Sequence, residues 1–308
     1  MSAPAPGRLV LLDAARGLAV VAMVAYHLVW DLGNFDYIDP EFPYSARFKG
    51  FGHAIALSFL FIAGVSLVLA HERNAGFGPF WRRLARIAAA AALVSLGTYL
   101  VFPQSFVFFG ILHCIAAASL LAAPFLSLPW PAALATAIAA FLAPLFLSAS
   151  LFDPTWLSWI GLSTVAPLTN DYQPLLPWSA ALFAGVAFAR FPGALHALGA
   201  VPAPQEGGAR IAGALRWLGR HSLAIYLLHQ PLLFGVFLAL ARLSAPSEDQ
   251  FAKNFVAACE TRCEADGGAI EFCSAACLCV EARASDLPNE PAERALRLKA
   301  LADDCVKP

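Results

Sequence analysis

The chain has 308 residues, of which 59% are hydrophobic and 13% are charged, and its formal net charge is −1. Soluble domains carry about 25% charged residues, so this composition excludes an ordinary soluble protein and indicates a polytopic membrane protein. The balanced charge and the lack of a basic block give no indication of nucleic-acid binding.

The first apolar segment, Leu9–Trp30, is 22 residues long and is apolar except for Asp13, Arg16 and His27. A bilayer core of about 30 Å needs roughly 20 helical residues, so this segment is long enough to span a membrane. The apolar run is too long for a signal peptide and lacks a small-residue cleavage site after it. We therefore expect it to remain as the first span.

The ionisable residues of this span are predicted to share one helix face. Arg16 and His27 are eleven residues apart, which is about three turns. Asp31 follows His27 at i,i+4, and Asp13 precedes Arg16 at i,i−3. Because ionisable groups are costly in lipid, this face should point toward a protein interior or a wet cavity. We interpret it as the axis of an active site that crosses the membrane.

Six further apolar segments predict seven spans in all. The additional segments are Phe51–Leu69, Leu84–Phe102, Val107–Phe125, Ala132–Leu147, Leu175–Ala189 and Ser222–Leu243. The fifth and sixth spans are short and contain Pro144 and Pro177, which predict broken or tilted helices. An eighth span is possible if part of Trp156–Pro167 enters the bilayer. The predicted fold is therefore an all-α polytopic membrane protein.

The distribution of Lys and Arg predicts the orientation. The loops 70–86 and 190–220 each contain four arginines, whereas the loops around Pro103 and over 153–173 contain no Lys or Arg. Basic loops lie on the cytoplasmic side. We therefore expect a protein of the cell (inner) membrane with its N-terminus cytoplasmic and its C-terminal tail extracytoplasmic.

The chain is predicted to divide into a transmembrane domain, 1–243, and a cysteine-rich tail, 244–308. The tail cysteines are Cys259, Cys263, Cys273, Cys277, Cys279 and Cys305. Two i,i+4 pairs joined by a turn through Asp266-Gly267-Gly268 predict a helical hairpin, and an even number of cysteines suits disulfides outside the cytoplasm. Nested pairing of Cys259–Cys277 and Cys263–Cys273 fits this geometry, which leaves Cys279 and Cys305 as the third pair. The spacing also resembles the twin C-x-x-x-C hairpins of small intermembrane-space proteins. Zinc ligation by the thiols is the alternative.

Other histidines also lie in apolar segments. His53 opens the second span, His113 lies inside the fourth, and His229 lies in the seventh. Each could be a hydrogen-bonded structural residue, but as a set they favour function, because intramembrane ionisable groups usually mark it. With the predicted orientation, all three can cluster with His27 in the outer half of the membrane.

A basic group stands at the cytoplasmic start of the third span. Arg82, Arg83 and Arg86 lie within six residues, and the last two are i,i+3 neighbours. Such arginines can simply anchor the helix on the positive-inside side. They can also form a phosphate clamp, since guanidinium forks suit the phosphates of a nucleotide-like cofactor.

These residues resemble two related groups of membrane enzymes. Arg16 followed eleven residues later by His27, together with Arg83-x-x-Arg86, is similar to the acyltransferase family 3 enzymes. This resemblance implies that the arginines handle the acyl donor and that the histidine is catalytic.

A wider resemblance is to bacterial relatives of heparan-α-glucosaminide N-acetyltransferase. Leu12–Ala19 resembles the opening D-x-x-R-G motif, and Phe59–Gly64 resembles F-x-F-I-x-G. Gly219–His229 resembles the late N-S-x-x-x-Y-x-x-H segment, with His221 in place of the asparagine. The resemblance covers about residues 8–243 and omits the tail. The lysosomal enzyme differs at His27, which leaves His27 and His53 as alternative catalytic residues; His27 is favoured because Asp31 can orient it.

The resemblance implies transfer of an acetyl or other acyl group across the membrane. Acyl-CoA, as co-substrate, would dock from the cytoplasm with its phosphates on Arg83 and Arg86, aided by Arg82. Its thioester would extend past Arg16 toward His27, the general base. Asp31 would fix the imidazole tautomer. Direct transfer and an acyl-histidine intermediate both remain open.

The acceptor would enter from outside as a hydroxyl or amine, most simply on a glycan. Candidate substrate-binding residues are His113, Asp171, Tyr172, Trp178, Ser222, Tyr226 and His229. The last three are at offsets 0, 4 and 7 and share a face. The aromatic residues among them could instead belong to an interfacial belt.

Two other function classes compete with acyl transfer. A transporter would use the proline-interrupted spans as broken helices around a polar path. A haem-binding redox protein would use histidines from separate spans as axial ligands. The first predicts substrate movement without acyl-CoA turnover, and the second predicts a Soret band.

Overall fold

The computed structural model describes residues 10–35, 37–39, 41–73, 77–199, 206–243, 256–257, 259–261, 263–264, 269–284, 301–302 and 304–305. In these residues the regular structure is helical, apart from a single bridge between Phe109 and Tyr172. The chain divides into two compact units, Met1–Leu238 and Ala239–Pro308. They are described separately below.

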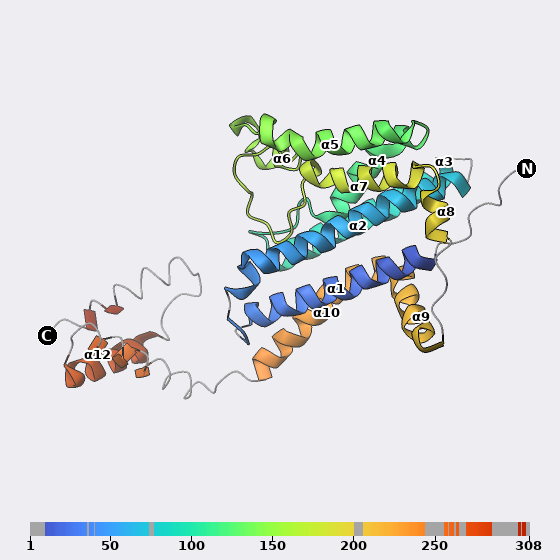
Figure 1. Cartoon of the computed structure of the whole chain (residues 1–308). Coiled ribbons are helices and arrows are strands. Elements are labelled where there is room, and N and C mark those ends of the chain that lie inside the picture. The colour runs from blue at the N-terminus through green and yellow to red at the C-terminus, as the bar shows by residue number, and fades with distance from the viewer. Residues whose placement is uncertain are drawn as a thin grey trace, which may run out of the picture. The chain divides into compact units, whose positions relative to one another are not determined.

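Seven apolar helices occupy the seven predicted spans (Figure 1). They are α1 (Val10–Asn34), α2 (Ala46–Arg73), α3 (Phe77–Val101), α4 (Ile111–Ala122), α5 (Trp130–Leu147), α7 (Leu175–Arg190) and α10 (Ser222–Leu243). Five of them are long and apolar enough to cross a membrane. The other two, α4 with η2 (Ala123–Leu126) and α7, are shorter. The predicted helical membrane architecture is confirmed.

Shorter elements lie in the connections. They are η1 (Phe42–Tyr44), η3 (Ser150–Phe152), α6 (Thr155–Ser158), α8 (Ala194–Gly199) and α9 (Glu206–Arg220). Residues 156–167 therefore do not form an eighth span, because four residues of helix are far too few to cross a bilayer. The expected interruption of the sixth span occurs at Leu176, which is non-helical just before Pro177. In contrast, α5 continues through Pro144.

Helix α7 packs between α2 and α5 (Figure 1). Two glycines permit the close α2–α7 approach. A Cβ on Gly64 would overlap the carbonyl oxygen of Leu182, and a Cβ on Gly185 would overlap that of Phe61. Small residues at such crossings let two backbones approach closely, which is how membrane helices gain van der Waals contact in the absence of a hydrophobic driving force.

The buried core lies among α2, α4 and α7. Leu60, Ala118 and Leu182 there are fully shielded from solvent. Large apolar side chains are conversely exposed elsewhere, including Leu145 and Phe146 of α5, at 71% and 79% exposure. Apolar groups that face outward and are not packed within the chain suit a lipid environment.

Helix α9 packs against the N-terminal half of α1. Gly17 faces the backbone of Leu215, and Gly219 faces the backbone of Asp13, so a Cβ at either glycine would overlap a carbonyl oxygen. Only His221 separates α9 from α10, and its N–H donates to the carbonyls of Trp217 and Leu218. Helix α10 then runs beside α1 (Figure 1), where Phe35 meets Phe234 and Phe237.

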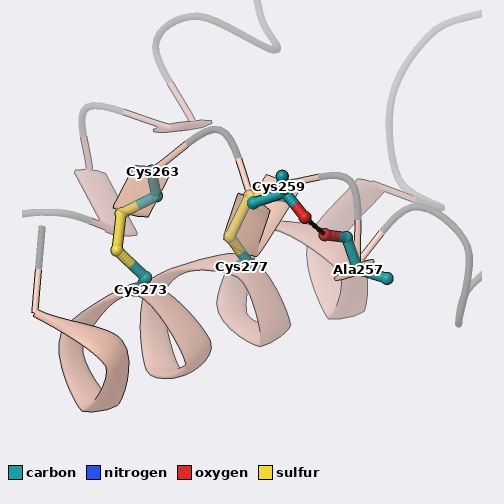
Figure 2. Close-up of a disulfide and its surroundings, with 6 residues drawn as sticks. Ala257, Cys259, Cys263, Cys273 and Cys277 are labelled. Carbon is teal, nitrogen blue, oxygen red and sulfur yellow. Dashed lines mark hydrogen bonds between the residues drawn. A yellow bond between two sulfur atoms is a disulfide. The ribbon is translucent and has the colours of Figure 1, made fainter. Parts of the chain in front are cut away.

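The second unit contains α12 (Ile270–Ala284) and three disulfides. Cys259 and Cys263 bond to Cys277 and Cys273 of α12, as Figure 2 shows. The third disulfide is Cys279–Cys305. The predicted pairing is confirmed, and the zinc alternative is wrong because these sulfurs are bonded to one another. The predicted turn at 266–268 lies outside the described residues.

Candidate functional site

The N-terminal end of the polar face of α1 is held by ion pairs. Asp13 is buried and accepts a hydrogen bond from Arg16 at 3.1 Å. Arg220, at the end of α9, lies 3.5 Å from the other carboxylate oxygen of Asp13. Arg16 also donates to the hydroxyl of Ser66 on α2 at 2.7 Å. The predicted Asp13–Arg16 pair forms and joins α1 to α2 and α9.

Arg83 reaches from α3 into the bundle, whereas Arg82 and Arg86 remain exposed. Its Nη2 donates to the carbonyl of Ala63 at 3.1 Å. Its Nη1 is buried and has no partner among the described residues, and the same is true of the Ser119 hydroxyl on α4. Both side chains line the same crevice among α2, α3 and α4, which is too narrow to hold a water molecule. The guanidinium groups of Arg16 and Arg86 lie near enough to Arg83 to repel it. This cationic group therefore has a free donor and favours an anion.

The C-terminal half of α1 meets α10 through two histidines. The rings of His27 and His229 lie 4.8 Å apart, with their planes at 59°. His229 is 8% exposed, and its Nδ1 lies 2.8 Å from the carbonyl oxygen of Tyr226. His27 forms no hydrogen bond to any described residue, so the ring of His229 is its polar neighbour. The sequence placed both histidines in the site, and the structure brings them together.

Asp31 does not hold His27 as the sequence predicted. This carboxylate is fully buried, and its Oδ1 accepts a hydrogen bond from the Gln230 amide at 2.9 Å. Helical i,i+4 spacing brings two side chains to one face but does not make them bond, and Gln230 from α10 satisfies the carboxylate instead. Oδ2 of Asp31 and Oε1 of Gln230 remain without partners in the described structure.

His53 and His113 do not join the histidine pair. His53 packs edge-on against Trp178 of α7, with ring centroids 5.1 Å apart. His113 accepts the Gly110 N–H at Nδ1 and lies 3.2 Å from the Ser95 hydroxyl. Both ring nitrogens of His113 are thus engaged at the start of α4. The expectation of one four-histidine cluster is therefore wrong, because His113 serves the α3–α4 connection and His53 faces α7.

Asp171 and Tyr172 organise the loop that precedes α7. Asp171 accepts the N–H of Ile111, the first residue of α4, at 3.1 Å, which satisfies a helix N-terminus with a negative charge. Burial raises the pKa of Asp171, and the hydrogen bonds to its carboxylate oppose that rise. The Tyr172 hydroxyl donates to the carbonyl of Ser158 at 2.7 Å. Both polar groups predicted to bind substrate are occupied by the protein's own backbone.

Ser222 and Tyr226 share the face of α10 that leads to His229. Ser222 begins the helix, next to the α9–α10 junction, and Tyr226 lies one turn further along. The Tyr226 ring is 5.8 Å from that of His229. Tyr226 therefore borders the histidine pair, whereas Ser222 lies about two turns before His229, at the start of α10.

Three polar residues of the site were missed by sequence reasoning. Ser66, Ser119 and Gln230 contact or line the groups described above. Gln230 could have been found, because an amide in the middle of an apolar span should have a partner. The two serines gave no comparable signal, since a serine in a membrane helix can bond to its own backbone.

The comparison with protein families decides the identity. A model of the heparan-alpha-glucosaminide N-acetyltransferase catalytic family matches residues 8–231. The chain belongs to this family. Comparisons with curated proteins and with solved structures gave no match. Membership of the heparan-alpha-glucosaminide N-acetyltransferase catalytic family makes the chain a membrane acetyltransferase-like protein.

The match to this acetyltransferase family contains the whole polar face of α1 and ends just after Gln230. It therefore includes both partners of the histidine pair and excludes the disulfide unit. The glycines in the two motifs that resemble this family have a role in helix packing. Gly17 of D-x-x-R-G packs on α9, and Gly64 of F-x-F-I-x-G packs on α7. These positions hold helices together, while Arg16 and His27 present the polar groups.

Proposed function

We propose that the chain transfers an acetyl or other acyl group from cytoplasmic acyl-CoA to an extracytoplasmic hydroxyl or amine, with a glycan as the natural acceptor. The observation that supports this most is the polar row along α1. At one end Arg16 lies beside the half-satisfied Arg83, and at the other His27 lies beside His229. Eleven residues separate the two ends, which is about 16 Å along a helix. A donor anchored by its phosphates at one end can thus present its thioester at the other.

The donor site would be built on Arg83. Its free Nη1, the hydroxyl of Ser119 and the nearby charges of Arg16 and Arg86 provide donors and positive potential for phosphate oxygens. Arg82, which is exposed, would contribute at the mouth of the site. The basic loops at this end support a cytoplasmic location, where acyl-CoA is available.

The acceptor site would lie at the outer end. His27 would act as the general base that takes the acceptor proton while the acyl carbon is attacked. Trp178, stacked edge-on with His53 in the outer half, offers an apolar ring face for a sugar. Asp171, through its loop, would shape the opening rather than touch the reacting atoms. His53, which has no contact with His27, is the weaker candidate for the base.

Acetyl-CoA binding and turnover by the purified full-length protein test this proposal, with an α-glucosaminide as the probe acceptor. Arg83→Ala should weaken acetyl-CoA binding at least tenfold, because it removes the buried guanidinium. His27→Ala should bind acetyl-CoA with unchanged affinity and lose turnover by about 10²-fold or more. Arg210→Ala is the matched control, since it removes an exposed arginine of α9 on the same predicted side.

Comparison of two donors sharpens the test. S-acetylpantetheine keeps the thioester but lacks the nucleotide phosphates. The wild type should prefer acetyl-CoA strongly over this analogue, and Arg83→Ala should abolish most of that preference. A wild type that binds neither donor, or an Arg83→Ala variant that keeps the full preference, would contradict the proposed donor site.

A further inference from the structure

The tautomer of His229 is set by the backbone of its own helix. Its Nδ1 lies 2.8 Å from the carbonyl oxygen of Tyr226 and 3.2 Å from that of Ile225. A carbonyl oxygen only accepts hydrogen bonds, so Nδ1 must carry the proton. In the neutral ring, Nε2 then has a lone pair. This atom is buried and has no partner among the described residues.

The buried polar cluster between α1 and α10, formed by Asp31, His229 and Gln230, contains hydrogen-bond acceptors that have no donor. The described structure leaves three buried acceptor atoms without a donor: Nε2 of His229, Oδ2 of Asp31 and Oε1 of Gln230. The Gln230 amide uses one of its two N–H groups on Asp31, and Nδ1–H of His229 is used on the backbone. One N–H of the Gln230 amide is therefore still available, and the ring N–H of His27 is a further side-chain donor, located on the ring that faces His229. Because a buried acceptor without a hydrogen bond destabilises the fold, a donation from the His27 N–H to Nε2 of His229 is favourable.

We infer that His229 is the positioning residue for His27: its Nε2 accepts the ring N–H of His27 and thereby fixes the tautomer whose other nitrogen is the base. The rings already lie 4.8 Å apart. The sequence assigned this orienting role to Asp31. In the structure, Asp31 is buried and bonded to Gln230, the residue that follows His229 in α10.

This inference rests on the proposed function for its chemical consequence, and the proton balance is complete. The acceptor O–H or N–H bond breaks and its proton moves to His27, while the acceptor atom bonds to the acyl carbon. The C–S bond breaks and its electron pair leaves with sulfur. The thiolate of CoA then takes a proton from His27, which returns to the neutral state still donating to His229. The titratable groups that border the pair are Tyr26, Tyr226 and Asp31.

Three substitutions of His229 in the full-length protein separate the possible roles. The amide nitrogen of His229→Asn can replace Nδ1–H on the backbone but leaves nothing at Nε2. The amide oxygen of His229→Gln can replace the Nε2 acceptor. His229→Ala removes both. If His229 orients His27, Asn and Ala should lower kcat at least about tenfold while Gln restores most of the rate. The affinity for acetyl-CoA should be unchanged in all three.

A direct readout keeps the test independent of turnover. Nitrogen NMR of the protein labelled in its histidine rings reports which nitrogen carries each proton, with resonances assigned by single His→Gln variants. The wild type should show His229 protonated at Nδ1 and His27 in one tautomer. His229→Asn should give His27 a mixture of tautomers, and His229→Gln should return it to one.

The outcomes separate this inference from the function on which it rests. A His27 tautomer that is unchanged in His229→Asn, or a neutral His229 protonated at Nε2, would overturn the inference whatever the activity. Full kcat in His229→Asn would also overturn it. If the wild type neither binds nor turns over acetyl-CoA, the proposed function fails, and the nitrogen spectra still decide how the two rings are paired.

Discussion

Asp31 and Gln230 form a buried polar contact between α1 and α10. Gln230→Leu should destabilise the protein by about 1–3 kcal/mol, because it leaves the buried carboxylate without a donor. Thermal unfolding of the detergent-solubilised protein measures this loss. Gln230→Glu should be at least as damaging, since it places a second acidic group against Asp31.

The matched control removes both partners. Asp31→Leu/Gln230→Leu should recover much of the stability lost in Gln230→Leu alone, because no polar group is then left unpaired. If the double variant is as unstable as the sum of the two single variants, the contact contributes through something other than its hydrogen bond.

Asp171 makes the stability of the protein depend on pH. Its pKa is raised above the ordinary 3.8 by burial, so the folded protein holds this proton more tightly than the unfolded chain. Stability should therefore decline as the pH rises from 3.8 through the raised pKa. Asp171→Asn keeps an oxygen that can accept the Ile111 N–H but does not ionise. Melting temperatures between pH 4 and pH 7 should fall less in this variant than in the wild type, and parallel profiles would contradict the assignment.

At the scale of helices, glycines determine which elements touch. Gly64→Ala should lower stability by about 1–3 kcal/mol, because its Cβ would overlap the backbone of Leu182 and force α2 away from α7. Gly97→Ala in α3 is the control, since nothing lies within 4 Å of the added carbon. Its effect should be neutral or stabilising, by up to about 1 kcal/mol. Equal destabilisation by both substitutions would argue against close packing as the cause.

The sequence predicts where each helix begins and ends far better than it predicts which other helices that helix contacts. Length and apolar composition define a span, so the seven segments were found and Arg16 and His27 were correctly placed on them. Hydropathy does not state which helix lies next to which, and so the partner of Asp31 was wrong. Gln230 lies 199 residues away in the chain, and only the fold brings it to Asp31. The disulfide pairing was predictable because its i,i+4 geometry is local.

For the whole molecule, the disulfides and the orientation make one linked prediction. If the tail is extracytoplasmic, intact cells should show its six cysteines as unreactive toward a membrane-impermeant maleimide, and reactive after treatment with an impermeant reductant. Disulfides persist in oxidising compartments and are rare in the cytoplasm. Cys114, buried in α4, should stay unlabelled in both conditions and serves as the internal control. Labelling that requires permeabilised cells would reverse the proposed orientation.

The glycine contacts between α1 and α9 also have a consequence for alignment. Gly17 and Gly219 fix α9 on α1, and α10 follows after the single residue His221. The segment from Gly219 to His229 corresponds to about 15 Å of helix. The packing contact at Gly219 therefore sets the position of His229 relative to His27 along the helix axis. A methyl group added at Gly219 would overlap the carbonyl oxygen of Asp13 and would shift α9, and with it α10, relative to α1. The imidazole rings of His27 and His229 would then no longer lie opposite each other, although neither histidine nor any residue in contact with them had been substituted.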